Sequence, residues 1–171
     1  MKNLKEELYL NLVNKHIQFV QEAGQILMKL DLPLEYSTIK FMSNLDKHDK
    51  SKYSRAEFKG YADYFFGEEG KIRTPEIIKN FDLAWHHHYM HNPHHPEHWF
   101  IVTKEGNTRP LEMPDIYIIE MLADWTGAGK AYGNPFETWV QSNLHRFMFA
   151  KGTERKVNEC VKIIVENGHG K

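Results

Sequence analysis

Apolar residues recur every three or four positions along most of this chain, and prolines and glycines interrupt the pattern. This spacing lines apolar side chains along one face of an α-helix, so the dominant secondary structure is helical. We expect helices at 3–30, 34–47, 54–66 and 75–91, a fifth that starts near residue 114, a sixth from about 135 and a seventh at 153–167. The predicted fold is therefore all-α, a single domain over residues 1–171 with about six or seven helices.

Several of these boundaries have a specific signal. Ser54 and Glu57 have the S-x-x-E spacing of a capping box, which predicts the start of the third helix. Thr74 followed by Pro75 is typical of an N-cap and the first turn of a helix. Residues 94–112 show no helical period, and the KEGNTRP segment within them predicts a short hairpin.

The apolar stripes predict which helix faces point into the core. The stripe on the first helix consists of Leu4, Leu8, Leu12, Phe19, Ala23, Leu27 and Leu30. The stripe on the second consists of Tyr36, Ile39, Met42 and Leu45. His16 falls on the first stripe, and His48 extends the second by one turn. Two imidazoles are thus expected to face the interior.

Composition and charge argue against several classes of protein. A formal net charge of −1, with no basic block, gives no signal for nucleic-acid binding. No apolar run approaches the ~20 residues that a membrane span needs, and the charged N-terminus does not resemble a signal peptide. The single cysteine, Cys160, cannot form an intrachain disulfide, which fits a reducing compartment. We expect a cytoplasmic protein without a membrane partner.

Four polar residues lie on the predicted apolar faces or directly beside them: His16, His48, Asp49 and Asp124. A buried carboxylate or imidazole needs a partner to offset its lost hydration, and one divalent cation can serve all four. Imidazole with carboxylate is the ligand set of zinc, manganese, iron and similar ions. Taken singly, each residue has a simpler explanation. A core histidine is usually hydrogen-bonded, an HD dipeptide occurs by chance, and Asp124 is able to cap a loop or pair with a lysine.

The order of these four residues resembles the H…HD…D signature of the HD-domain superfamily of metal-dependent phosphohydrolases. The segments HDKSKYSRAEF, AWHHHYMHNPHH and EMLADW, followed by GKAYGN and FETW, also resemble a small uncharacterised HD-like family of bacteria and phages. The resemblance covers roughly residues 16 to 140. It implies an all-α fold whose metal ligands come from several helices, and it leaves the substrate open because the small family has none assigned.

The segment AWHHHYMHNPHHPEHW, residues 84–99, contains seven of the chain's eleven histidines. In several HD proteins, histidines downstream of the HD pair hold a second metal ion. The resemblance implies that role for His87 and His88, which lie on or beside the inner side of the predicted fourth helix. His91 lies four residues after His87, so a helix-face pair is also possible. A solvated, metal-binding surface is the alternative for the whole segment.

His94 and His95 follow the Pro93 break and are candidates to fold back over the site. They would act as further ligands or as contacts to substrate phosphate, and spacing does not separate the two roles. His88 is also a candidate to donate a proton to the leaving group. His86 and His98 are expected at the surface.

Three further residues are candidates for catalysis or substrate binding. Lys52 lies three residues after Asp49, where two-metal HD enzymes with an HD-x-x-K pattern have a phosphate contact. Single-metal HD nucleotidases have an acidic residue there, so Lys52 departs from their pattern. Glu57 is a candidate base, although the capping box explains it without chemistry. Lys130 lies in GAGKAYGN, which we expect to be a glycine-rich loop after the Asp124 helix; it is a candidate to close over a phosphate or is simply solvated.

The leading hypothesis is a metal-dependent phosphohydrolase that acts on a nucleotide or another small phosphate ester, with a metal-activated water as nucleophile. The cofactor would be one or two divalent ions, Mn, Zn, Fe, Co or Mg. One alternative is a di-iron oxygenase of the HD type. Another is a non-catalytic module that binds metal and nucleotide and uses aromatic residues such as Trp99, Tyr132 and Trp139 at an interface. HD proteins are often dimers, so a homodimer is possible.

Overall fold

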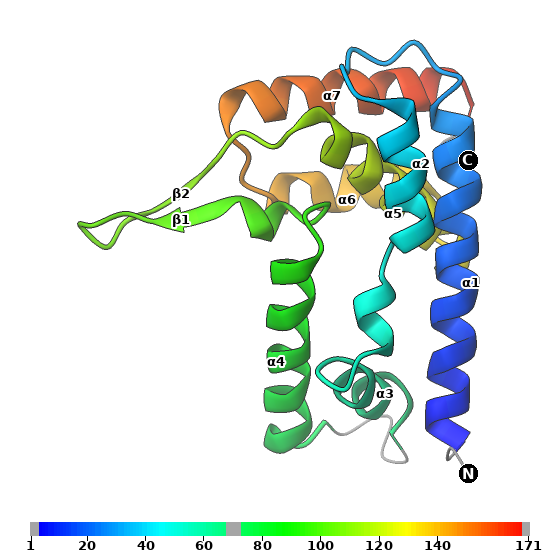
Figure 1. The fold of residues 1–171 in the computed structure, drawn as a ribbon, viewed down its shortest axis with the longest axis vertical. Helices are drawn as coiled ribbons and strands as arrows, with labels where there is room; N and C mark the ends of the chain where they lie inside the picture. Colours follow the sequence, from blue (N-terminus) through cyan, green and yellow to red (C-terminus); the bar gives the residue numbers. More distant parts are fainter. Residues whose placement is uncertain (1–3, 68–72, 169–171) are drawn as a thin grey trace.

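The structure is a computed structural model that describes residues 4–67 and 73–168, apart from the side chain of Tyr132. Within this part of the chain it contains seven α-helices, three short 3-10 helices and one two-stranded hairpin (Figure 1). In chain order the elements are α1 (Leu4–Leu27), α2 (Thr38–Lys47), η1 (Lys50–Tyr53), α3 (Phe58–Phe66), α4 (Pro75–His91), η2 (Pro96–Trp99), β1 (Phe100–Val102), β2 (Thr108–Pro110), α5 (Asp115–Tyr132), α6 (Phe136–Asn143), η3 (Leu144–Arg146) and α7 (Lys151–Glu166). The predicted all-α class is confirmed.

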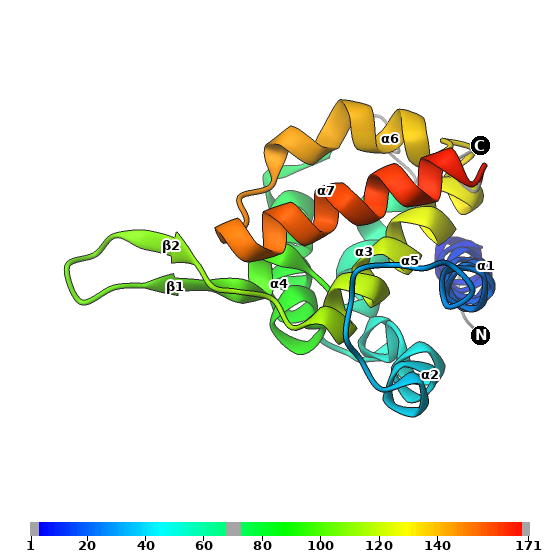
Figure 2. The same ribbon diagram turned by 90° about the horizontal axis from the view of Figure 1, so that it is seen from above.

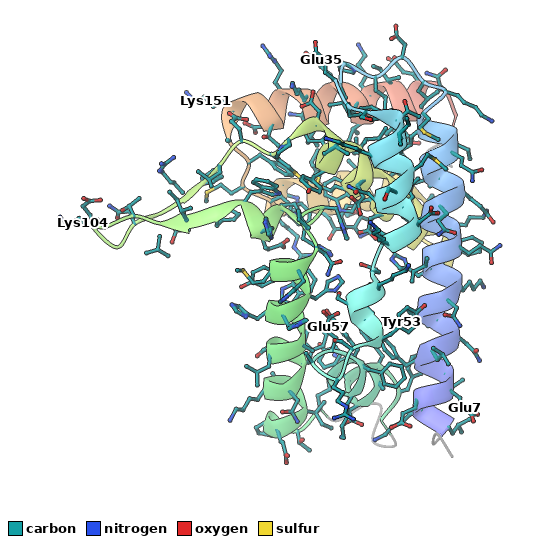
Figure 3. The ribbon with its side chains drawn as sticks, viewed as in Figure 1. Glu7, Glu35, Tyr53, Glu57, Lys104 and Lys151 are labelled. Carbon is teal, nitrogen blue, oxygen red and sulfur yellow. The ribbon has the colours of Figure 1, made fainter. Side chains whose placement is uncertain are left out.

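Helices α1 and α5 form the central pair of the fold and make its most extensive helix–helix contact. Helix α3 packs against the N-terminal half of α1 and α4 packs against α3, while α2 and α7 lie toward the other end of α1 (Figure 1). The antiparallel hairpin β1–β2, with Phe100 opposite Pro110, projects from this body in both views (Figures 1 and 2). Lys104 lies at its tip (Figure 3).

The buried side chains form two apolar clusters that meet along α1. The main cluster joins α1, α2, α5, α6 and α7 and includes Val20. The smaller cluster consists of Tyr9, Val13, Tyr61, Ala62 and Ala84, from α1, α3 and α4. His16 is buried on α1 between Val13 and Val20, so it lies where the two clusters meet. The polar residues considered below therefore occupy the boundary between two apolar regions.

Most predicted helix boundaries agree with the structure to within a few residues. Thr74 caps α4, because its Oγ1 accepts a hydrogen bond from the Ile77 amide over 3.3 Å, and α4 ends at His91 before Pro93. The predicted hairpin and the seventh helix are also present, and Gly168 follows that helix with a φ of 74°. The second helix starts at Thr38, four residues later than predicted.

Two local predictions were wrong. The capping box does not form: α3 begins at Phe58, and Glu57 makes no side-chain cap hydrogen bond because its carboxylate points into the protein interior. The GAGK segment is not a loop, since α5 continues through it to Tyr132. Gly127 lies against the backbone of α1 at Val20, so its missing side chain permits helix packing here, and Gly129 lies against the Asn134 carbonyl just beyond the end of α5.

Two apolar stripes were also assigned partly to the wrong face. On α1, Leu4 is 72% exposed whereas Tyr9 and Val13 are buried. Steps of four residues advance about 40° around a helix, so a stripe read at that interval drifts off the core side. On α2, Ile39 in the first turn is 85% exposed, and Phe41 is buried instead.

The aromatic residues considered for an interface pack mainly against the interior. Trp99 and Trp139 are partly buried and contact the main cluster, and the side chain of Tyr132 lies outside the described part. No helix in the described ranges combines the length and the apolar character that crossing a membrane would require.

The distance between α1 and α5 depends on Gly127. A Cβ atom at this position would lie 2.5 Å from the Val20 amide nitrogen and 2.8 Å from the Phe19 carbonyl carbon. Gly127→Ala therefore has to push the two helices apart, and we expect the free energy of unfolding to fall by about 1–3 kcal/mol, as for other overpacked interiors.

Equilibrium urea unfolding measures this change. Asn11→Ala, on the exposed side of α1, is the control and should alter the free energy of unfolding by less than about 0.5 kcal/mol. Equal stability of the two variants would contradict the assignment of Gly127 as the spacer.

Candidate metal centre

The HD pair lies at a sharp turn between two helical segments. His48 is the C-cap of α2, and Asp49 has a left-handed backbone with φ 57° and ψ 16°. Asp49 is the one non-glycine residue with positive φ in the described ranges, a conformation that aspartate tolerates better than most residues. This turn lets two adjacent side chains face the same side, and such conformations are found often at functional sites.

The first group of possible ligands comprises His16, His48, Asp49 and Asp124. His16 Nε2 lies 3.0 Å from Asp49 Oδ2 and 3.1 Å from Asp124 Oδ1. His48 Nε2 lies 3.6 Å and 3.3 Å from the same two oxygens. Bonds of ~2.0–2.1 Å to a tetrahedral ion would separate the ligand atoms by about 3.3 Å. The donor types and their spacing therefore fit one divalent metal ion.

The second group comprises Asp49, His88, His94 and His95. Asp49 Oδ1 lies 3.4 Å from His88 Nε2 and 3.6 Å from His94 Nε2, and His95 Nε2 lies 2.9 Å from His88 Nε2. Asp49 Oδ1 and His94 Nε2 are buried, and neither has a hydrogen-bond partner in the part of the chain that the structure describes. Buried polar atoms seldom lack partners. These two fit a cation between them.

Asp49 belongs to both groups. Its Oδ2 faces the histidines of the first group, and its Oδ1 faces those of the second. Its side chain is 1% exposed. One buried carboxylate therefore joins the HD turn and the histidine-rich segment, which are far apart in the sequence, into one site.

Two buried glutamates lie behind the histidines. Glu120 Oε1 accepts from Nδ1 of His48 over 3.1 Å and lies 3.3 Å from Nδ1 of His94. Glu57 accepts from Nδ1 of His87 over 2.7 Å and from Nδ1 of His88 over 2.8 Å. An ionised carboxylate only accepts hydrogen bonds, so these contacts place the proton of His48 and His88 on Nδ1. Nε2 is then left as the ligand atom, as in other carboxylate–histidine–metal arrangements.

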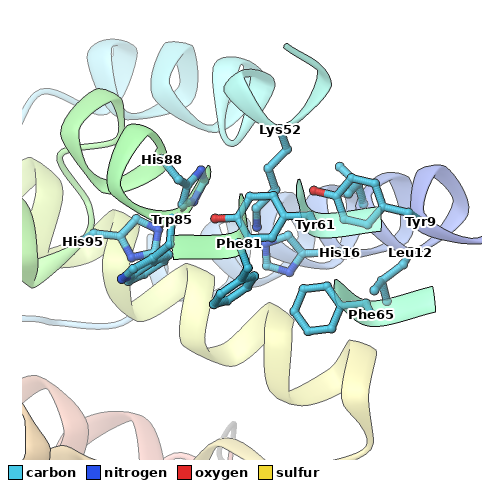
Figure 4. A pocket seen from close by; sticks show the side chains of 11 residues that line it. Tyr9, Leu12, His16, Lys52, Tyr61, Phe65, Phe81, Trp85, His88 and His95 are labelled. Atoms are coloured by element: carbon cyan, nitrogen blue, oxygen red, sulfur yellow. Dashed lines mark hydrogen bonds between the residues drawn. The ribbon is translucent and has the colours of Figure 1, made fainter. Parts of the chain in front are cut away.

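A cavity of about 180 Å³ borders both groups (Figure 4). His16 of the first group and His88 and His95 of the second line it, together with Lys52. The Lys52 ammonium contacts Asp49 Oδ2 over 2.5 Å. The rest of the wall is apolar or aromatic: Tyr9, Leu12, Val13, Tyr61, Phe65, Phe81 and Trp85. The cavity therefore presents one cation and several imidazoles at one end of an apolar space.

The charges of these groups depend on one another. Burial opposes ionisation of Asp49, yet Lys52 and His48 hold its pKa well below the usual range. Burial also opposes the imidazolium of His48, but Asp49, Asp124 and Glu120 outweigh it and raise the pKa of His48 to about 10. The pKa of Glu120 falls to about 2 through its contacts with His48 and His94, despite its burial. Without metal, His48 therefore holds a proton that an ion would displace.

His88 and His95 of the second group are different, because burial makes them favour the neutral form. Burial lowers the pKa of His88, although Asp49 and Glu57 oppose this. Burial, together with His94 and His88, holds the pKa of His95 well below its usual value. Neutral imidazole is the form that binds a metal ion, so these histidines are already in the ligand state at neutral pH.

The structure brings most of the predicted site residues together, but not all of them. His16, His48, Asp49 and Asp124 form one group, and His88, His94 and His95 join the other. His87 belongs to neither group and hydrogen-bonds Glu57 instead. Lys130 is exposed on α5 and pairs with Glu22 over 2.6 Å, and it does not line the cavity beside Lys52.

The position of Glu57 is also different from that of a base facing a reacting water. Both of its oxygens accept hydrogen bonds from histidines of α4, beside which Glu57 lies (Figure 3). It is thus placed to orient His88. Glu120 was not predicted as a site residue. Its spacing of four residues before Asp124 on one helix was the available signal.

The fold and the site together define a mostly helical protein with adjoining groups of possible metal ligands. Two of these groups share Asp49, and a third consists of His48, His94 and Glu120. Comparison with family models identifies the chain as a member of DUF5662, a family of unknown function, over residues 5–169. Searches of curated proteins and of solved structures found no match. These comparisons do not assign the chain to the HD superfamily.

Because Glu120 orients one histidine of each group, its removal should weaken metal binding in both. We expect Glu120→Gln to lower metal affinity by about 10–100-fold, since outer carboxylates of this kind contribute that much in other sites. Competition with a chromophoric chelator measures the affinity. Glu159→Gln, exposed on α7, is the matched control and should bind metal like the wild type. Unchanged affinity in Glu120→Gln would show that the histidines are held by other contacts.

The raised pKa of His48 predicts that a rise in pH lowers the stability of the metal-free protein and increases the stabilisation by metal. A histidine whose folded pKa rises from 6.5 to about 10 contributes stability below pH 6.5 that is lost as the pH rises toward 10. Metal binding requires the deprotonated ring, so stabilisation by metal should grow over the same range.

Thermal unfolding between about pH 6.5 and 8.5 tests this expectation, in chelator and in excess Mn²⁺. The melting temperature in chelator should fall with pH, and the difference between the two conditions should widen. A constant difference across this range would contradict the assignment of the displaced proton to His48.

Proposed function

We propose that this protein is a metal-dependent phosphohydrolase with two metal ions per chain, acting on a nucleotide or another small phosphate ester. The observation that carries the proposal is Asp49, which presents one oxygen to each of two adjoining ligand groups. A pair of ions bridged by a carboxylate is a common way to hydrolyse phosphate esters. The H…HD…D order of the ligands supports the same class by resemblance.

His16, His48, Asp49 and Asp124 would hold the first ion, and Asp49, His88, His94 and His95 the second. When bound, the ions would lower the pKa of a coordinated water from ~15.7 toward ~7 and offset charge on the phosphoryl oxygens. Glu57 and Glu120 keep the histidine Nε2 atoms turned toward the centre.

Lys52 is the residue best placed to bind the phosphoryl group. It lines the cavity that borders both groups, and its ammonium already lies against the shared carboxylate. A compact ammonium beside a phosphate neutralises negative charge as it moves to the leaving oxygen. The apolar walls of that cavity exclude bulk water, which strengthens these electrostatic interactions.

One observation favours a second candidate, a di-iron oxygenase of the HD type. The second group offers three imidazoles and one carboxylate, a set that suits iron as well as zinc or manganese. Two irons per chain together with substrate-dependent uptake of O₂ would select this reaction over hydrolysis. Tight binding of metal and nucleotide without turnover would instead identify a binding module.

Elemental analysis of untagged protein, paired with a phosphatase screen, tests the proposal. We expect about two ions per chain in the wild type, as in other carboxylate-bridged pairs. His48→Ala and Asp49→Asn should lose metal and at least about 100-fold in turnover while helical circular dichroism is retained. Asp46→Asn makes the same chemical change at an exposed position three residues away and is the matched control.

Lys52→Gln separates phosphate binding from metal binding. It should lower turnover while the metal content stays at the wild-type level, because Lys52 is not a ligand in either group. The proposal would be overturned if metal-free Asp49→Asn hydrolysed phosphate esters as fast as the wild type.

A further inference from the structure

A second and larger cavity adjoins the candidate metal centre on another side. It has a volume of about 440 Å³ and is enclosed by three stretches of chain: the end of α4 with η2, the second half of α5, and α6 with η3. Cavities that bind small organic ligands usually measure ~300–1,000 Å³. The cavity beside Lys52, at about 180 Å³, falls below this range, whereas the larger one lies within it.

The larger cavity touches both ligand groups. Asp124 belongs to the first group and His95 to the second, and both residues line the cavity wall. Trp85 and His95 also line the smaller cavity, so the two spaces share part of one wall. A ligand in the larger cavity would therefore lie against the residues that hold both ions.

The walls are built largely from flat aromatic rings. Trp85, Trp125, Trp139 and Phe147 line the cavity. The rings of Trp125 and Phe147 are stacked with centroids 5.2 Å apart, and Trp125 and Trp139 lie 4.9 Å apart. Aromatic walls of this kind bind planar rings by stacking, which contributes ~1–3 kcal/mol for a nucleic-acid base.

One carboxylate oxygen in this cavity lacks a hydrogen-bond partner among the described residues. This atom is Glu97 Oε2, which is buried. A buried acceptor without a donor is costly, so this position favours a ligand that brings N–H groups.

The charge of the cavity argues against a simple cation as the ligand. Arg146 lines the same space, and its positive charge acts on Glu97. Of the charged side chains that line the cavity, Asp124 belongs to the first ligand group, and Glu97 and Arg146 carry opposite charges that offset each other. A neutral planar ring with hydrogen-bond donors on its edge matches these walls better than an ammonium group.

We propose that this cavity binds the base of a nucleotide substrate, stacked on the tryptophans, with the Glu97 carboxylate accepting hydrogen bonds from the N–H groups of the base. Guanine presents two adjacent donors, N1–H and N2–H, that match the two oxygens of a carboxylate. We therefore expect a preference for guanine over adenine, cytosine and uracil. As an account of the substrate, this inference rests on the phosphohydrolase function proposed above.

Binding of free nucleosides tests the cavity without any turnover. Three of the chain's four tryptophans line it, so a stacked base should quench the intrinsic fluorescence. Guanosine, adenosine, cytidine, uridine and tetramethylammonium are titrated into metal-free wild type, Glu97→Gln and the control Glu105→Gln, which alters an exposed residue of the hairpin turn. Circular dichroism establishes that each variant is folded.

The expected result is saturable quenching that is strongest with guanosine and at least tenfold weaker in Glu97→Gln, with Glu105→Gln like the wild type. Three results would overturn the inference. They are that no nucleoside quenches the fluorescence, that Glu97→Gln binds guanosine as tightly as the wild type, or that only tetramethylammonium quenches. Nucleoside binding without phosphate release would uphold this cavity and reject the hydrolase. Hydrolysis of a simple aryl phosphate without nucleoside binding would uphold the hydrolase and reject this cavity as a site for the base.

Discussion

The candidate site depends on the position of one carboxylate. Asp49 lies at a left-handed turn between α2 and η1, is almost completely buried and faces histidines on both sides. Such a charge is tolerated in an interior only when surrounding groups offset its lost hydration. Lys52 and the imidazoles do so here, and an ion in each group would do so more completely. His16 and His48 lie toward Oδ2 of Asp49, and His88 and His94 lie toward its Oδ1.

The helices hold these ligands through close packing of small residues. Gly127 brings α5 against the backbone of α1 at Val20, and Asp124 and His16 lie about one turn further along the same two helices. The contact that sets the helix separation therefore also sets the spacing of the first group. The second group depends on the chain reversal after α4, where Pro93 ends the helix and His94 and His95 turn back toward Asp49.

Much of this arrangement follows from the sequence, for physical reasons that can be stated. His16 and His48 were recognised because each interrupts an apolar stripe, and an imidazole in such a stripe needs a partner. Glu120 was missed because an acidic residue on a helix flank is usually solvated, and only the three-dimensional structure shows the two histidines in front of it. Periodicity likewise could not place the residues after Pro93, since they follow no helical period.

The same limits explain the errors. Glycine was taken as a sign of a loop at GAGK, but in a tightly packed helix pair its lack of a side chain is what permits contact. Ser54 and Glu57 had the spacing of a capping box, yet Glu57 is recruited by two histidines that lie thirty residues further along the chain. A local signal was overridden by a long-range contact that no spacing rule contains.

Glu120 has one more consequence, because it holds His48 of one group and His94 of the other through a single oxygen. Any shift of that carboxylate on loading one group is transmitted to the other, as is the change of charge on Asp49. If both groups bind ions as proposed, their occupancies would be thermodynamically linked, and linkage is reciprocal: whatever factor the first ion imposed on the affinity for the second, the second would impose on the first. The proposed centre would then take up its ions as a cooperative unit, not as two independent sites.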